Sequence, residues 1–386
     1  MRSIGTSAKG IRTLSMVKSG ENLEDVVMAA LKRSIDNGEV ILKDRDILGI
    51  TESLLARCQN NFVTFDNIKE DIISKFGENS EIGVVFPIFS RNRFLLMLKA
   101  ISRSAKKVYV QLAYPQDEVG NPLVDYDKFM NSGINPFSDS FNEDSFRSHF
   151  EKEDFIHPFT GVDYIELYKS AGDNIEILIS NDACNILNYT NNVIVSDIHT
   201  RFRTAKKLSD NGGKVIRLDE IMNSSINGSG FNKDYGLLGS NYSQEETLKL
   251  FPRDGKVVVE SIQSKIKDVY GKLVEVMIYG DGAFKDPVCG IWELADPVVS
   301  PFYTDGLEGT PNELKMKYLV DSGNLSEEEM KNKIKERQNT KQESLGTTPR
   351  RITDLVGSLC DLVSGSGDKG TPIVLVQGYF DNYSDE

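Results

Sequence analysis

Residues 83–114 read GVVFPIFSRNRFLLMLKAISRSAKKVYVQLAY, and this stretch decides the fold class. Residues 83–89 and 107–114 are short runs rich in apolar, β-branched and aromatic side chains, which is typical of buried strands. Between them, residues 93–105 carry apolar side chains at helical spacing. A strand, a helix and a second strand in succession predict an α/β fold whose sheets are covered by helices.

The same alternation extends along the rest of the chain. Further predicted strands are residues 46–51, 175–180, 192–198, 214–218, 274–280 and 372–379. Asn22 can cap a helix whose apolar residues recur on one face, and Ser326 forms a capping box with Glu329 at the start of a charged helix. The length of 386 residues suits two domains. We predict an N-terminal α/β region over residues 1–250 and a C-terminal α/β region over residues 251–386.

Composition and charge exclude several classes of function. The formal net charge of −13 argues against a nucleic-acid-binding protein, which needs a basic face. There is no apolar run of about 18 residues that would span a membrane, and residues 1–16 lack the apolar core of a signal peptide. The four cysteines are scattered, so neither a zinc site nor a disulfide framework is predicted. We therefore expect a soluble cytoplasmic protein with no nucleic-acid or membrane partner.

The usual sequence motifs of nucleotide sites are missing. GxxxxGK(S/T) and GxSxG are absent, and no GxGxxG stands between a predicted strand and a helix, which argues against a P-loop or a Rossmann dinucleotide site. Two pairs of arginines nevertheless follow predicted strands, where open α/β sheets bind anions. These pairs are Arg91 with Arg93 and Arg201 with Arg203. The alternative for both pairs is a solvated basic surface.

Acidic side chains at two places can hold a hard cation. Asp281 stands between two glycines directly after a predicted strand, where the backbone can approach a ligand closely. On the predicted helix over residues 351–365, Asp354 and Asp361 are separated by seven positions and share one face. The structural alternatives are a tight turn around Asp281 and a solvated acidic face on the helix.

Two groups of motifs lie near the ends of the chain. They are GIR at 10–12, KSGENL at 18–23 and DILGIT at 46–51, followed by ITDLVGSLCDLVSG at 352–365 and GTPIVLVQG at 370–378. In this order they resemble the motifs of the coenzyme F(420)-0:γ-glutamyl ligase family. The resemblance covers residues 8–62 and 234–386. The intervening residues 63–233 are longer than in the core family and look like an extended bacterial branch.

The resemblance implies a fold and a reaction. The fold is a mixed-sheet, two-domain α/β fold of the γ-glutamyl ligase type, assembled as an intertwined homodimer. The reaction is the ligation of L-glutamate to a carboxylate-bearing cofactor, either the deazaflavin F(420)-0 or a folate. GTP or another nucleoside triphosphate would activate the carboxylate as an acyl phosphate, with Mg²⁺ or Mn²⁺ neutralising the phosphates.

The resemblance also assigns roles to single residues. Asp281 falls on the metal-binding aspartate of the family, and Asp354 and Asp361 would hold the cation with it. Arg57 follows the DILGIT motif and would act with Asp281 in catalysis. The expected nucleotide- or substrate-binding residues are Arg91, Arg93, Arg201, Arg203, Gly239 and Asn241.

Two alternatives stay open. The first is a non-catalytic nucleotide- or cofactor-binding protein on the same fold, which a missing metal in the purified protein would favour. The second is an acyl-activating enzyme that attaches something other than glutamate. Only a screen of substrates separates this enzyme from a glutamate ligase.

Overall fold

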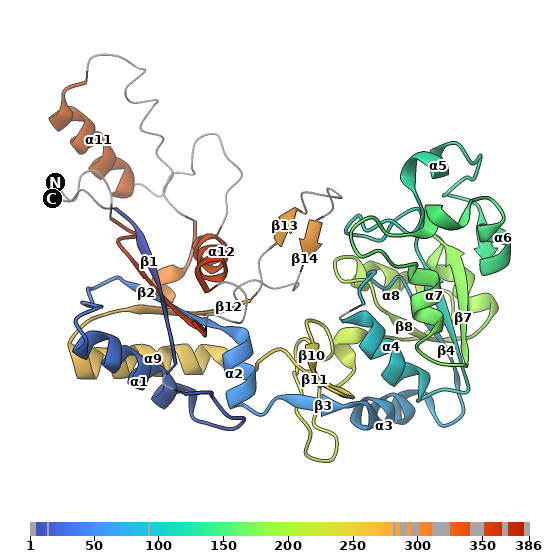
Figure 1. Cartoon of the computed structure of the whole chain (residues 1–386), viewed down its shortest axis with the longest axis horizontal. Helices are drawn as coiled ribbons and strands as arrows, with labels where there is room; N and C mark the ends of the chain where they lie inside the picture. Colours follow the sequence, from blue (N-terminus) through green and yellow to red (C-terminus); the bar gives the residue numbers. More distant parts are fainter. Residues whose placement is uncertain are drawn as a thin grey trace. The chain divides into compact units, whose positions relative to one another are not determined.

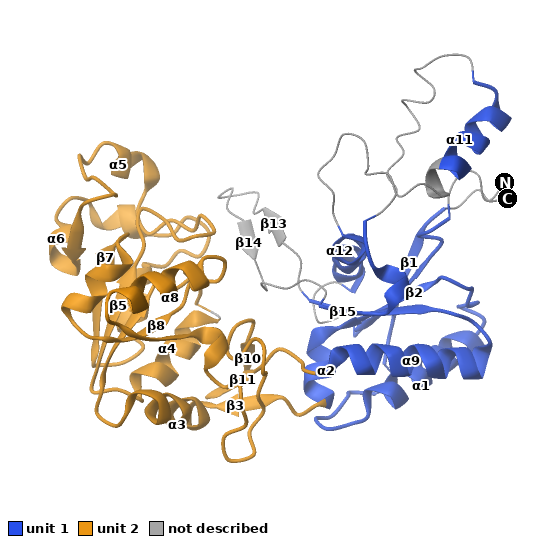
Figure 2. Cartoon of the chain, turned by 180° about the vertical axis from the view of Figure 1, so that it is seen from behind, with its two compact units in different colours: residues 1–58, 254–282, 298–386 blue, residues 59–253, 283–297 orange. Residues whose placement is uncertain are grey.

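The computed structural model describes residues 5–13, 15–91, 93–280, 301–310, 325–339, 351–364 and 370–381, and the backbone of 283–285 and 292–294. The chain forms two compact units (Figure 2). Unit 1 comprises residues 1–58, 254–282 and 298–386, and unit 2 comprises residues 59–253 and 283–297. This division differs from the predicted regions 1–250 and 251–386, because the N-terminal residues pack with the C-terminal segments. Within the described ranges, no helix has both the length and the apolar surface that crossing a membrane requires.

Unit 1 is built on a mixed sheet whose described strands follow the order β1-β16-β2-β12-β15. Their bounds are β1 (Ser7–Ile11), β16 (Ile373–Gln377), β2 (Ile47–Thr51), β12 (Glu275–Tyr279) and β15 (Phe302–Tyr303). β2 and β12 run parallel, and the other neighbours run antiparallel. The strand at the N-terminus thus pairs with the strand at the C-terminus, with Ser7 opposite Gln377. The three strands predicted at 46–51, 274–280 and 372–379 are confirmed, with ends that differ by one or two residues.

Helices cover both faces of the unit 1 sheet (Figure 1). α1 (Leu23–Asp36) and α9 (Gly255–Tyr270) pack on one face, in a core that includes Leu48 and Ile50. α12 (Ile352–Ser364) packs on the other face, in a core that includes Ile47. Successive side chains of a strand point to opposite faces, so β2, whose first four residues are buried, contributes to both cores.

Two predicted helix caps are present in unit 1. Asn22 accepts the backbone N–H of Asp25 at 3.1 Å and caps α1. Ser326 and Glu329 form the predicted capping box at the start of α11 (Glu327–Asn339), with Ser326 N donating to the Glu329 carboxylate at 2.8 Å. Both caps satisfy N–H groups that a helix leaves without partners at its start.

Unit 2 contains a doubly wound sheet whose described strands follow the order β6-β7-β5-β4-β8-β9. Their bounds are β6 (Ser140–Asn142), β7 (Ile175–Ser180), β5 (Lys107–Leu112), β4 (Glu81–Val85), β8 (Asn192–Val195) and β9 (Lys214–Arg217). The edge strand β6 is antiparallel and the others are parallel. The winding reverses between β4 and β8, since β4 leads on to β5 on one side and β8 leads to β9 on the other. Such a switch point leaves a crevice outside the carboxyl ends of the strands.

Helices also cover both faces of this sheet. α3 (Phe65–Phe76), α4 (Phe94–Ser102) and α7 (Tyr164–Lys169) pack on one face, and α8 (Arg201–Asp210) packs on the other. Other described elements of unit 2 include α5 (Tyr126–Met130), α6 (Glu143–Arg147) and a small sheet of β10 (Asn241–Gln244), β11 (Thr247–Lys249) and β3 (Phe62–Thr64). The two strands β13 (Ala283–Lys285) and β14 (Trp292–Leu294) pair with each other. The lack of a GxGxxG between a predicted strand and a helix argued against a Rossmann site, yet the winding of this sheet is of the Rossmann type.

The loop after β4 departs from the sequence-based prediction. β4 ends at Val85, although the strand was predicted to reach residue 89. Phe86 has a positive φ of 56°, and a proline follows it without an N–H, so the strand ladder stops there. The chain then crosses the end of the sheet before α4 begins at Phe94.

Candidate functional site

Unit 1 contains a pocket of about 660 Å³ at the edge of the sheet where β2 and β12 end and β16 begins. We call it the motif pocket, since residues of the N-terminal and C-terminal motifs meet there. Thr51 and Tyr279, the last residues of β2 and β12, lie in its wall. The other described lining residues are Arg12, Thr13, Ser15, Met16, Val17, Ser53, Leu54, Arg57, Asp361, Ser364, Gly370, Thr371 and Pro372.

Short connections place Arg57 at this pocket. β2 passes directly into α2 (Glu52–Cys58), so Arg57 lies in the last turn of a helix that starts at the strand end. The carbonyl of Arg57 accepts hydrogen bonds from Gly20 N at 3.2 Å and from Ser19 Oγ at 3.3 Å. Two residues of the KSGENL motif therefore bind to the last turn of α2 through the backbone carbonyl of Arg57.

Gly49 allows the helix that carries Asp361 to lie close to the sheet. A Cβ atom at Gly49 would lie only 2.5 Å from Sγ of Cys360 and 3.2 Å from Tyr279. Burial raises the pKa of the Cys360 thiol to about 12, so this side chain is a neutral packing group. Asp361 follows it directly and faces the pocket.

The charges in the motif pocket suit an anionic substrate. Arg12 and Arg57 are exposed, and neither forms an ion pair with a residue that the structure describes. Asp361 is the one acid among the described lining residues, and Thr51 and Ser53 add hydroxyl groups. Guanidinium groups bind carboxylates and phosphates through paired hydrogen bonds, while carboxylate and hydroxyl oxygens suit Mg²⁺.

Of the three predicted metal ligands, the structure describes Asp354 and Asp361, and only Asp361 lines the motif pocket. Asp361 lies in the motif pocket, whereas Asp354 does not line it and forms an ion pair with Arg351 at 2.7 Å. Asp281 lies outside the described residues. Among the residues that the structure describes, no group of three His, Cys, Asp or Glu side chains could hold a metal ion.

Unit 2 contains a second pocket, of about 270 Å³, at the switch point of its sheet. Arg91, Arg93 and Gly239 all line it, so three of the predicted nucleotide- or substrate-binding residues come together there. We call it the switch-point pocket. Its walls include the loop after β4, the helix α4, residues 119–121 and 157–164, the residues after β8 and the segment 238–240.

The other residues that were predicted to bind nucleotide or substrate do not line this pocket. Arg201 pairs with Asp219 at 3.4 Å and donates to the carbonyl of Ile198, so it fixes the start of α8. Arg203 is exposed on α8, and neither arginine lines the pocket. Asn241 follows the lining residue Ser240, and its side chain accepts the N–H of Tyr242 at 2.8 Å.

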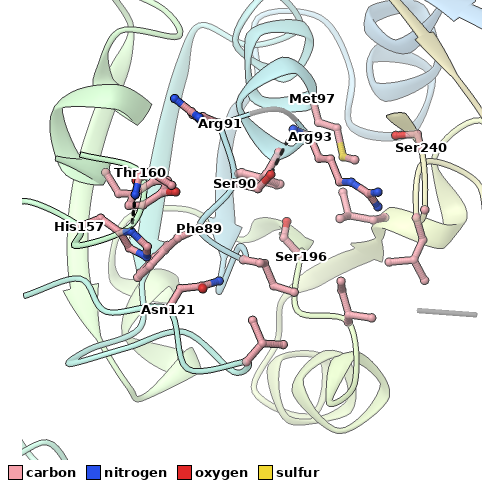
Figure 3. Close-up of a pocket in the computed structure, with 18 of the residues that line it drawn as sticks. Phe89, Ser90, Arg91, Arg93, Met97, Asn121, His157, Thr160, Ser196 and Ser240 are labelled. Atoms are coloured by element: carbon pink, nitrogen blue, oxygen red, sulfur yellow. Dashed lines mark hydrogen bonds between the residues drawn. The ribbon is translucent and has the colours of Figure 1, made fainter. Parts of the chain in front are cut away.

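Sequence reasoning missed three buried polar residues of the switch-point pocket. His157, Ser196 and Ser240 line it (Figure 3), and each is at most 2% exposed. Ser196 directly follows β8, and a polar residue at the end of a buried parallel strand is a usable sequence signal. His157 and Ser240 stand in loops far from β8 in sequence, and they reach this end of the sheet only through the tertiary fold.

The motif pocket combines guanidinium groups that pair with no described acid, a carboxylate and hydroxyl groups at the end of an α/β sheet, and this set of groups suits phosphate- or carboxylate-bearing substrates. Comparison with protein families gives a match to F420-0:Gamma-glutamyl ligase over residues 10–378. The chain therefore belongs to this family, as its motifs indicated, and the family implies a ligase that forms C–N bonds. Comparison with curated proteins gives no match.

Proposed function

We propose that the motif pocket joins L-glutamate to the carboxylate of an F(420)-0-type acceptor, with a nucleoside triphosphate as the activating co-substrate. The observation that supports this most is the convergence of distant motifs. Arg12, Thr51, Arg57, Asp361 and Thr371 come from four separate segments of the chain and line one pocket. These segments carry the resemblance to the ligase family.

The chemistry requires activation, because a carboxylate and an amine do not condense readily in water. In the proposed reaction an acceptor carboxylate oxygen attacks the γ-phosphorus, and the nucleoside diphosphate leaves. The amine of L-glutamate then attacks the acyl carbon of the mixed anhydride. Inorganic phosphate leaves, and the amine loses a proton as the amide forms. Phosphoryl transfer of this kind depends mainly on positioning and on neutralisation of charge.

The pocket residues can supply both requirements. Arg57 and Arg12 are placed to bind phosphate or carboxylate groups, since their guanidinium groups make no ion pair with a described residue. Mg²⁺ at phosphate sites usually takes one or two protein carboxylates and completes its shell with water and substrate oxygens, so the donor set with Asp361 fits this ion. Asp361 and Asp281 would hold it, and when bound it would neutralise negative charge on the phosphates.

Analysis of products tests this proposal. The purified chain is incubated with ¹⁵N-labelled L-glutamate, GTP or ATP, Mg²⁺ or Mn²⁺, and either F(420)-0 or a folate. We expect an acceptor that has gained one labelled glutamate, with one diphosphate nucleotide and one phosphate released per amide bond. Absence of a product with every nucleotide and both acceptors would favour the non-catalytic binding protein.

A pair of variants tests the location of the site. Arg57→Ala should reduce ligation by at least about tenfold, because a charged hydrogen bond to substrate is lost. Arg33→Ala is the matched control, since Arg33 is exposed on α1 and does not line the pocket. Equal activities of the two variants would place the reaction elsewhere. Light scattering on the same samples tests the homodimer that the resemblance implies.

A further inference from the structure

The ligation proposed above assigns no step to the switch-point pocket, and the chemistry of its walls indicates a ligand of its own. Of the described residues that line it, none is Asp or Glu, whereas Arg91 and Arg93 carry positive charge. Arg91 forms no ion pair with a described residue. A volume of about 270 Å³ suits a small molecule rather than a dinucleotide.

His157 lines this pocket and carries a buried hydrogen-bond donor. Its Nδ1 accepts the backbone N–H groups of Phe159 at 3.2 Å and Thr160 at 3.1 Å, so this nitrogen carries no proton. Burial lowers the pKa of His157 and favours the neutral ring. The proton of a neutral imidazole must then be on Nε2. Nε2 is buried and has no hydrogen-bond partner among the described residues.

Two serine hydroxyls add to this set of donors. Oγ of Ser196 and Oγ of Ser240 are buried and have no partner among the described residues. In Figure 3, His157 lies on one side of the pocket, Ser196 in the middle, and Ser240 with Arg93 on the other side. Buried polar groups are costly when they lack a partner, so donors from several segments favour a molecule rich in oxygen acceptors.

Gly236 brings Ser240 to the pocket. Its φ is +50°, and a Cβ atom there would lie 2.3 Å from the carbonyl oxygen of Ile221. Glycine thus lets this turn approach the backbone of residues 219–221, and Leu237 N donates to Leu218 O at 3.0 Å. The segment 238–240 follows directly and closes one wall of the pocket.

Aromatic side chains form another wall. Phe89 and Tyr164 are stacked with ring centroids 5.4 Å apart and an interplanar angle of 23°. Phe94 and Met97 of α4 add buried apolar surface, each at most 5% exposed. Flat apolar groups pack well against such a surface.

We propose that the switch-point pocket binds a small organic molecule that combines an oxyanion, either a phosphate ester or a carboxylate, with a flat apolar ring. Arg93 and the hydroxyls of Ser196 and Ser240 would donate to the oxyanion. Phe89, Tyr164 and Phe94 would contact the ring, and His157 Nε2 would donate to an oxygen acceptor on that side of the pocket. The proposal does not rest on the ligase function, because its test measures binding alone.

Nuclear magnetic resonance of the full chain with ¹⁵N-labelled histidine provides the first test. The chain has three histidines, so His157 can be assigned from the signals that His157→Gln removes. We expect His157 to carry its proton on Nε2 in the free protein. Phenyl phosphate or benzoate should shift its signals and leave those of His149 and His199 in place. Protonation on Nδ1, or no shift with either compound, would overturn the proposal.

Titration calorimetry with four probes separates the parts of the ligand. Phenyl phosphate and benzoate distinguish a phosphate ester from a carboxylate, and either one should bind more tightly than both partial probes. Inorganic phosphate lacks the ring, and benzamide lacks the charge. If inorganic phosphate binds as tightly as phenyl phosphate, the aromatic wall has no role. If benzamide binds as tightly as benzoate, the negative charge of the oxyanion has no role in binding. Either result contradicts the proposal.

Variants locate the binding. Arg93→Ala should weaken binding by at least about tenfold, and the matched control Arg203→Ala should not, since Arg203 does not line the pocket. Ser196→Ala should weaken binding several-fold without lowering the melting temperature, because it removes a buried hydroxyl that lacks a protein partner. A purely structural role would lower the melting temperature and leave affinity unchanged. Unchanged affinity in both pocket variants would place the ligand elsewhere.

Discussion

Replacing Gly49 by alanine tests whether the contact between β2 and α12 holds the motif pocket together. The new Cβ would lie 2.5 Å from Sγ of Cys360, about 1 Å inside ordinary contact. Gly49 has no positive φ, so alanine fits its backbone and stiffens the unfolded chain by about 0.4–1 kcal/mol. Overpacking of a closed core costs about 1–3 kcal/mol, and this cost should prevail. We expect a net loss of about 1–2 kcal/mol, with displacement of Asp361.

Urea unfolding followed by circular dichroism measures the loss, and hydrogen exchange of residues 47–51 and 352–364 reports on unit 1 separately. Gly5→Ala is the control, since a Cβ at Gly5 meets nothing within 4 Å. Cys360→Ala in the same chain removes the clashing sulfur. The loss of unfolding free energy in the double variant should therefore be about 1 kcal/mol smaller than the sum of the losses in the two single variants. Strictly additive losses would refute the proposed clash.

Three further predictions concern single carboxylates. Asp281→Asn should abolish ligation with a change in stability within about 1 kcal/mol, and wild-type activity across Mg²⁺ concentrations would reject its role. Asp361→Asn should raise the Mg²⁺ concentration for half-maximal activity, whereas Asp354→Asn should not; equal effects would contradict the placement of the ion. Burial raises the pKa of Asp117 to about 6 from 3.8, although backbone N–H groups oppose the shift. The folded state therefore binds the proton more tightly. Relative to Asp117→Asn, the wild type should lose about 2 kcal/mol of unfolding free energy as the pH rises from 4 to 6.5, and a constant difference would refute this.

Much of the α/β organisation could be predicted from local sequence. The strand at 175–180 was predicted with both ends correct, because a β-branched run between polar residues has one favourable conformation. The caps at Asn22 and Ser326 were predicted correctly for a similar reason, since a capping side chain bonds to a backbone group only three residues away. The family was recognised from short motifs, which keep their order along the chain however the chain folds.

The division into units and the composition of both pockets depended on long-range pairing. β1 and β16 are adjacent although more than 360 residues separate them, and no local pattern specifies which strands become neighbours. The reversal between β4 and β8 likewise exists only in the assembled sheet, and it brings His157, Ser196 and Ser240 together. Asp354 and Asp361 share a helix face in the sequence, yet only Asp361 reaches the motif pocket, because the close approach at Gly49 sets where α12 lies. Local sequence thus determined the elements and the reactive groups they carry, while the packing of distant segments decided which groups share a pocket.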